Sequence, residues 1–98
     1  MELDIAQIAI PTMGRDKEKP FFIIGIEENY VYLADGRIRK IENPKRKKIK
    51  HINPTDLDGG HVAQKLRNGE RVTNSELRKA LSVFEKRKNN IGLDEEGE

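Results

Sequence analysis

The sequence predicts a mainly β protein in which a small barrel of about five short strands precedes an α-helical appendage. Up to about Pro54, short runs rich in Ile, Val, Tyr and Phe alternate with turn signals, a pattern typical of a small half-open or closed barrel. After Pro54 the apolar residues recur at helical spacing. With 98 residues, the chain is long enough for one domain with one modest core.

The expected strands are short and rich in β-branched and aromatic residues. In chain order they cover residues 6–10, 20–26, 30–34, 37–41 and 46–52, and Pro54 ends the last of them. The pair Asp35-Gly36 is the strongest hairpin signal, because both central residues of a type I′ turn need positive φ. We therefore expect residues 37–41 to pair back along residues 30–34 until Asn43-Pro44 breaks the pairing.

Two helices are expected after the strands. The first covers about residues 61–68, and Gly69 suits the left-handed position that ends a helix. The second covers about residues 74–88 and begins with two independent signals. These signals are a capping box, Thr73 with Glu76, and a hydrophobic staple, Val72 with Leu77. The apolar stripe of this helix consists of Leu77, Leu81 and Phe84.

These elements divide the chain into a barrel at residues 1–55, a helical appendage at residues 56–90 and a disordered acidic tail at residues 91–98. The longest apolar run, residues 21–26, is too short to cross a bilayer. The chain contains no Cys, and its first residues are acidic where a secretory signal is basic. We therefore expect a cytoplasmic protein with no membrane association.

Catalysis has little support in the sequence. His51 and His61 have no Cys, no zinc-protease spacing and no nucleophile motif near them. We interpret His51 as an ordinary strand residue in preference to a pH-sensitive phosphate contact. Glu27 and Glu28 are adjacent, so on a strand they face opposite ways and are poorly placed as an acid and base pair. We expect no enzyme activity, no catalytic residue, no metal site and no cofactor.

Positive charge is concentrated in one stretch of an almost neutral chain. Residues 37–50 contain eight basic residues and one acid, Glu42, and so carry a formal charge of +7. The whole chain carries +2, so the remainder sums to −5. Such clustering is unfavourable unless something negative lies opposite, and a polyphosphate backbone is the commonest such partner.

Strand alternation predicts that this charge gathers on one hairpin. Arg37 and Arg39 are two residues apart, so both side chains leave the same face of one strand. Lys48 and Lys50 do the same on the next strand, and the turn at Pro44 contributes further basic residues. The alternative is a solvated basic run that protects a sheet edge. The asymmetry of charge between this hairpin and the rest of the chain favours binding of RNA or DNA.

The first loop reads Gly14-Arg15-Asp16-Lys17-Glu18-Lys19-Pro20, and the apolar strand Phe21-Phe22-Ile23-Ile24-Gly25-Ile26 follows it. This segment resembles a KOW motif, which is a strand, a loop with Gly and basic residues, and a second apolar strand. Such motifs occur in ribosomal large-subunit proteins and transcription elongation factors. In this chain Glu18 stands where many KOW loops carry a second Gly.

The resemblance extends beyond the loop, over about residues 5 to 85. Residues 34–41, 44–51 and 68–81 resemble the KOW-domain RNA-binding proteins of Gram-positive bacteria. These are related to a KOW-containing large-subunit ribosomal protein of archaea and eukaryotes. The resemblance implies an SH3-like barrel and binding of RNA, with ribosomal RNA as the expected partner in a ribosomal or translational setting. The implied RNA contacts are Arg15, Lys17, Lys19, Arg37, Arg39, Lys40, Lys45, Arg46, Lys47, Lys48 and Lys50.

Tyr30 and Tyr32 share the strand face opposite Val31 and Leu33. They can stack on unpaired bases, worth roughly 1–3 kcal/mol each, or cover the barrel exterior beneath the C-terminal helix. We favour the packing role. Alternation also predicts that one of Phe21 and Phe22 is a core residue.

Two other functions remain open from the sequence. SH3-like barrels also bind peptides, and the apolar stripe of the C-terminal helix can dock on a protein partner, so a protein-interaction module is one alternative. An accessory role in transcription elongation is the other. We expect the free protein to be a monomer.

Overall fold

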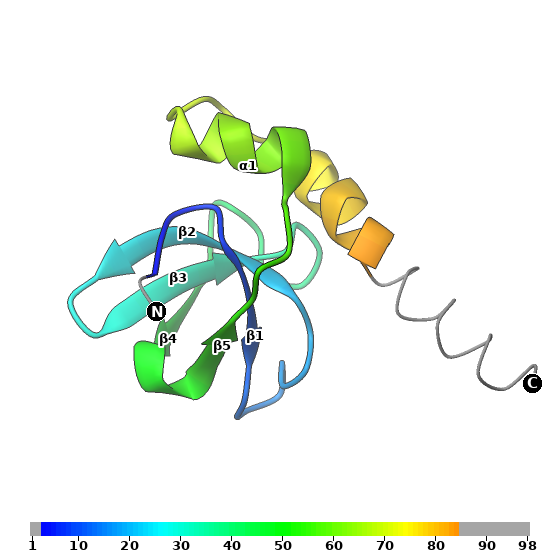
Figure 1. The fold of residues 1–98 in the computed structure, drawn as a ribbon. Helices are drawn as coiled ribbons and strands as arrows, with labels where there is room; N and C mark the ends of the chain where they lie inside the picture. Colours follow the sequence, from blue (N-terminus) through cyan, green and yellow to red (C-terminus); the bar gives the residue numbers. More distant parts are fainter. Residues whose placement is uncertain (1–2, 85–98) are drawn as a thin grey trace, which may run out of the picture.

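The computed structural model describes residues 3–84, and these form a five-stranded antiparallel sheet followed by two helices (Figure 1). The strands are β1 (Ile8–Pro11), β2 (Phe21–Glu27), β3 (Tyr30–Ala34), β4 (Lys45–Lys48) and β5 (Ile52–Pro54). Their order in the sheet is β4-β3-β2-β1-β5. The first helix is α1 (Gly60–Arg67), and the second is described over residues 74–84. No helix among the described residues is long and apolar enough to cross a membrane.

The two edges of the open sheet are joined by a very short connection. Strands β4 and β5 lie at opposite edges, yet only the 3-10 turn Ile49–His51 separates them in the chain. A flat sheet of five strands separates its edges by about 19 Å, at roughly 4.8 Å per neighbouring pair. Three residues of 3-10 helix rise only about 6 Å. The sheet is therefore strongly curled, although strand pairing does not close it.

The two faces of the curled sheet belong to two different cores. The buried residues of the inner core all come from strands: Ala9, Phe21, Ile23, Val31, Leu33 and Ile52. The outer core lies between the sheet and the helices: Ala6, Ile8, Phe22, Ala34, Val62, Ala63, Val72, Leu77 and Leu81. Successive strand residues alternate between the cores, as the two-residue period of a strand requires.

Phe21 and Phe22 are adjacent residues that are both buried, because a core lies on each face of the sheet. The sequence predicted that one of the two is a core residue, but both are fully buried. Phe21 fills the inner core, while Phe22 enters the outer core against the helices. The expectation was wrong because it assumed a sheet with one solvated face, whereas helices cover the second face here (Figure 1).

The helix ends follow the sequence signals closely. Thr73 and Glu76 form the predicted capping box: the Thr73 N–H donates to Glu76 Oε1 at 3.0 Å, and the Glu76 N–H donates to Thr73 Oγ1 at 3.1 Å. A hydrogen bond from Lys65 at 2.7 Å and the backbone bond from Thr73 lower the pKa of Glu76 to about 2. Gly69 has the predicted left-handed conformation, with a φ of 74°, after α1. The predicted continuation to residue 88 and the acidic tail at residues 91–98 lie outside the described residues.

The predicted strand at residues 37–41 is wrong, because this segment is part of a loop between β3 and β4. Its backbone donors are used elsewhere. Asp35 Oδ1 accepts hydrogen bonds from the N–H groups of Arg37 and Arg39, at 3.0 and 2.9 Å. The N–H of Ile41 donates to Asn74 Oδ1 at 2.8 Å. A side-chain carboxylate has therefore replaced strand pairing as the local acceptor, which Asp favours in turns.

The predicted last strand, residues 46–52, is divided in the structure. Its first half is β4, which pairs with β3 so that Tyr30 lies opposite Lys48 and Leu33 opposite Lys45. The 3-10 turn follows, and β5 then pairs with β1. Pro54 is the last residue of β5, opposite Ala9, so it ends this strand as the sequence predicted. Proline is tolerated there because β5 is an edge strand.

The loop at residues 35–44 is held against the second helix by further contacts besides the hydrogen bond from the Ile41 N–H to Asn74. A Cβ on Gly36 would lie 2.1 Å from the backbone oxygen of Asn74, so these two backbones touch. Arg78 Nη1 donates to the Gly36 carbonyl at 2.7 Å. Asn74 Nδ2 donates to both carboxylate oxygens of Glu42, at 2.9 and 2.8 Å, and this bond lowers the pKa of Glu42. We call these contacts the loop clamp. The helix is therefore tied to the loop by specific polar contacts.

Comparing Gly36→Ala with Gly69→Ala tests the loop clamp. Both glycines have positive φ, 78° and 74°, so alanine strains each backbone by about 1–2 kcal/mol. Only Gly36 faces a backbone atom, since a Cβ at Gly69 meets nothing within 4 Å. We expect Gly36→Ala to lower the free energy of unfolding by a further ~1–3 kcal/mol, as overpacking does. Chemical denaturation of both variants measures this difference, and equal losses would contradict the close approach.

Candidate nucleic-acid interface

The loop between β1 and β2 contacts the basic segment that follows β3. Lys47 Nζ, on β4, donates to the carbonyl of Met13 at 2.6 Å. Arg39 Nε forms an ion pair with Asp16 Oδ2 at 3.0 Å, and the Asp16 residue is 93% buried, with a relative exposure of 7%. These two contacts place the loop between β1 and β2 beside both the loop at residues 35–44 and strand β4. The two basic regions of the sequence are therefore neighbours in the fold.

The predicted RNA contacts differ in their exposure. The exposed residues are Arg15, Lys17, Lys19, Arg37, Lys40, Arg46, Lys48 and Lys50, which we call the basic surface. Arg39, Lys45 and Lys47 are half-buried. The Asp16 carboxylate neutralises Arg39, and the Met13 carbonyl holds Lys47. The charge available to a partner is accordingly carried mainly by the exposed residues.

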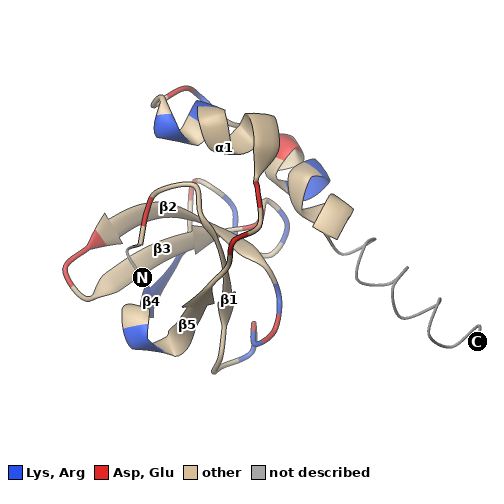
Figure 2. Ribbon diagram, in the orientation of Figure 1, with Lys and Arg blue, Asp and Glu red and all other residues tan. Residues whose placement is uncertain are grey.

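The sequence predicted that the positive charge gathers on one hairpin, and this prediction is wrong. Arg37, Arg39 and Lys40 lie in the loop beside the second helix, Lys48 ends β4, and Lys50 lies in the 3-10 turn. Figure 2 shows Lys and Arg on β4, on the turn after it and in neighbouring loops, whereas the β2–β3 turn carries acid. The expectation failed because the loop at residues 35–44, and not a tight turn, connects the paired strands β3 and β4.

Strand β4 presents its basic residues alternately on two faces. Arg46 and Lys48 pair with Tyr32 and Tyr30 in the ladder and so share the outer face of the sheet. Lys45 and Lys47 pair with Leu33 and Val31, which belong to the inner core. Inward-facing charge on an edge strand hinders pairing with a second chain. Inward-facing and outward-facing basic residues therefore alternate along this one strand.

The tyrosines do not support the second helix, so the predicted packing role beneath that helix is wrong. The helix packs instead over Phe22 and Ala34 in the outer core. The Tyr30 ring lies under the Arg46 guanidinium, 3.7 Å from the ring centroid, in a cation–π contact.

Tyr32 packs on the sheet itself. Its ring covers Gly25 on β2, where a Cβ would lie 3.2 Å from Tyr32 Cδ2. Its hydroxyl donates to Glu27 Oε1 at 2.7 Å, and this bond to an anionic acceptor raises the pKa of Tyr32. The hydroxyl thus has a partner within the sheet.

Sequence reasoning missed three residues that shape this surface. Asp16 orders Arg39, Asn74 accepts the Ile41 N–H, and Arg78 reaches the carbonyl of Gly36. Asn74 and Arg78 lie within the helix predicted at residues 74–88. No local pattern identifies their partners, which lie more than 30 residues away in the chain. The one signal available in the sequence was an acid, Asp16, between the basic residues Arg15 and Lys17.

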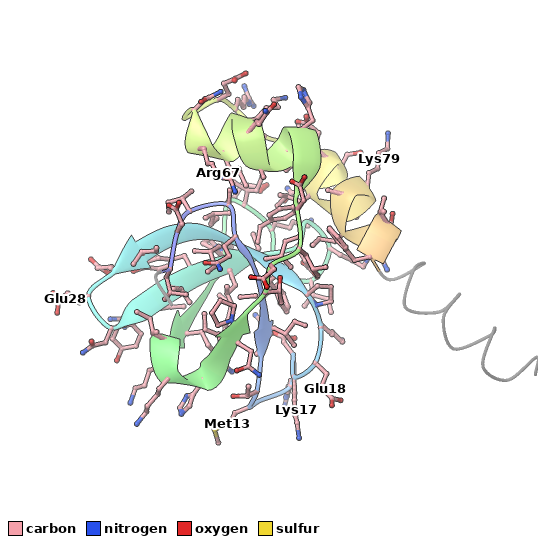
Figure 3. The ribbon with its side chains drawn as sticks, in the orientation of Figure 1. Met13, Lys17, Glu18, Glu28, Arg67 and Lys79 are labelled. Atoms are coloured by element: carbon pink, nitrogen blue, oxygen red, sulfur yellow. The ribbon has the colours of Figure 1, made fainter. Side chains whose placement is uncertain are left out.

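The loop between β1 and β2 contains two non-adjacent residues with positive φ. Gly14 has a φ of 93°, and Glu18 has a φ of 70°. The Glu18 N–H donates to the Pro11 carbonyl at 3.0 Å, which fixes the return of the loop toward β1. Glycine is the residue best suited to such a backbone. Figure 3 shows Met13, Lys17 and Glu18 together at the tip of this loop.

Comparison with known proteins does not assign the chain to a group. No protein-family model matches the chain, and no curated protein matches it.

Replacing Glu18 by glycine tests the strain in this loop. Relief of a left-handed conformation at a non-glycine residue is worth about 1–2 kcal/mol, less the entropy that glycine adds to the unfolded chain. We expect the free energy of unfolding of Glu18→Gly to be about 1 kcal/mol higher than that of Glu18→Gln. The Gln variant removes the same charge but keeps the backbone strain. Thermal or urea unfolding measures the pair. A Gly variant that is less stable than the Gln variant would contradict the left-handed assignment.

Proposed function

We propose that the protein binds structured RNA, chiefly through phosphates, as a cytoplasmic component of a ribosomal or translational assembly. The observation that carries this proposal is the contact between two basic regions that lie far apart in the sequence. The Lys47–Met13 and Arg39–Asp16 contacts join the KOW-like loop to the segment of residues 37–50. Adjacent clusters of like charge repel each other, and a phosphate backbone relieves that repulsion.

We propose in addition that the curled sheet is an SH3-like barrel. This proposal is supported by the five antiparallel strands and by the short turn that draws edge strands β4 and β5 together. In such a barrel the outward-facing residues of β4 and the β1–β2 loop are both accessible to one large RNA.

The composition of the basic surface favours phosphates over base edges as ligands. Its members are Lys and Arg on loops, one edge strand and one turn, and such cationic side chains suit phosphate oxygens. Phosphate contacts fix position without reading sequence. Recognition should therefore depend on the shape of the RNA. Five to eight such contacts correspond to a log-log salt slope of roughly −4 to −7.

A salt titration with matched variants tests the proposal. The variant Arg46→Gln/Lys48→Gln removes two exposed charges from β4. We expect it to reduce the magnitude of the log-log salt slope for a labelled RNA hairpin by roughly 1.4–1.8. Fluorescence anisotropy over a salt series measures the slope. The control is Arg67→Gln/Lys79→Gln, which removes the same charge from the two helices (Figure 3) and should leave the slope unchanged.

Other results would favour the alternative functions. Absence of RNA binding by the native chain, or equal slopes for both double variants, would contradict the proposal and favour a protein-interaction module. Competition with duplex DNA addresses the remaining alternative. If DNA displaces the RNA hairpin at equal concentration, an accessory role in transcription is favoured over a ribosomal one.

A further inference from the structure

A surface hollow lies where the KOW-like loop, the loop at residues 35–44 and the second helix meet. Its polar lining consists of Lys19, Asp35, Arg37 and Arg78, and its apolar walls come from Pro20, Ile38 and Leu81. Lys19 and Arg37 belong to the basic surface, whereas Arg78 comes from the second helix. The hollow therefore brings together cations from three separate segments of the chain.

The single acid of the hollow is already committed to the backbone. Asp35 Oδ1 accepts hydrogen bonds from the N–H groups of Arg37 and Arg39, at 3.0 and 2.9 Å. Three cationic side chains and one carboxylate leave the lining with a formal charge of +2. Such a concentration of positive charge is unfavourable in the absence of an anion.

Arg78 is held in position for an anion. Its Nη1 donates to the Gly36 carbonyl at 2.7 Å, and this bond uses one of the five N–H groups of the guanidinium. The helix that carries Arg78 is anchored on either side, because Leu77 is fully buried and Leu81 has a relative exposure of 4%. A planar guanidinium with a fixed orientation suits two-point contact with a phosphate.

We propose that this hollow binds one backbone phosphate of the RNA, with Arg78 as its central ligand and Lys19 and Arg37 beside it. This inference rests on the proposed function, since it extends the RNA path from the basic surface onto the second helix. Continuity supports it, because two of the three cations already belong to that surface. The second helix thus takes part in RNA binding directly and is more than a cover for the outer core.

The test compares Arg78→Gln with Lys79→Gln, its neighbour on the same helix. The Gln side chain keeps an N–H donor but loses the charge and the fork. We expect Arg78→Gln to weaken binding of the labelled RNA hairpin about five- to twentyfold and to reduce the magnitude of the salt slope by roughly 0.7–0.9. Lys79 lines a different hollow and points outward (Figure 3), so Lys79→Gln should match the native chain.

Two further variants make the outcome decisive. Arg78→Lys keeps the charge but not the fork, and its affinity should lie between those of Arg78→Gln and the native chain. Lys19→Gln, on the exposed loop, should also reduce the magnitude of the slope by roughly 0.7–0.9, and Arg78→Lys decides the question if Arg78→Gln fails to fold as judged by circular dichroism. Native affinity of Arg78→Gln, or of Arg78→Lys where Arg78→Gln does not fold, would overturn this inference and leave the proposed function standing. No RNA binding by the native chain would overturn both.

Discussion

The close approach of the loop at residues 35–44 to the second helix is the contact on which the rest of the structure depends. Gly36 has no side chain and a positive φ, so its backbone can touch that of Asn74. Asn74 and Arg78 then bind the loop through Ile41 and the Gly36 carbonyl. A segment without strand pairing is in this way fixed between the sheet and the helix. Basic side chains on it acquire defined positions that a free loop would not give them.

The same docking completes the hydrophobic core. The outer face of the sheet exposes Ile8, Phe22 and Ala34 unless the helices cover it, and Leu77 and Leu81 are the main covering side chains. Each of these leucines contributes roughly 1.5–3 kcal/mol on burial, a large fraction of the stability of a chain this small. Fold and candidate site are therefore coupled: the helix that buries Phe22 also carries Arg78 to the edge of the basic surface. A sheet without its helices would lose both the burial of Phe22 and the contribution of Arg78 to the surface.

The parts that the sequence predicted well are those encoded by neighbouring residues. The capping box at Thr73 and the left-handed Gly69 follow from local geometry, and β3 has the expected bounds, Tyr30–Ala34. Failures occurred where a distant partner decides the structure. Asp35-Gly36 resembles a tight hairpin turn, but Asp35 uses its carboxylate to hold a wider loop that also docks on the second helix. Clustering of charge was visible in the sequence, whereas its division among a loop, a strand and a turn required the fold.

Hydrogen exchange of the Ile41 amide tests most directly whether the loop at residues 35–44 and the second helix are held together as one unit. That N–H lies in a loop and donates to the side chain of Asn74 at 2.8 Å, whereas the Leu77 N–H lies within the second helix and donates to the Thr73 carbonyl at 3.2 Å. If the loop and the helix open as one unit, both amides exchange with similar free energies of opening, and Asn74→Ala removes the protection of Ile41. Exchange of Ile41 at the rate of an unstructured chain, while Leu77 stays protected in the native protein, would contradict the account.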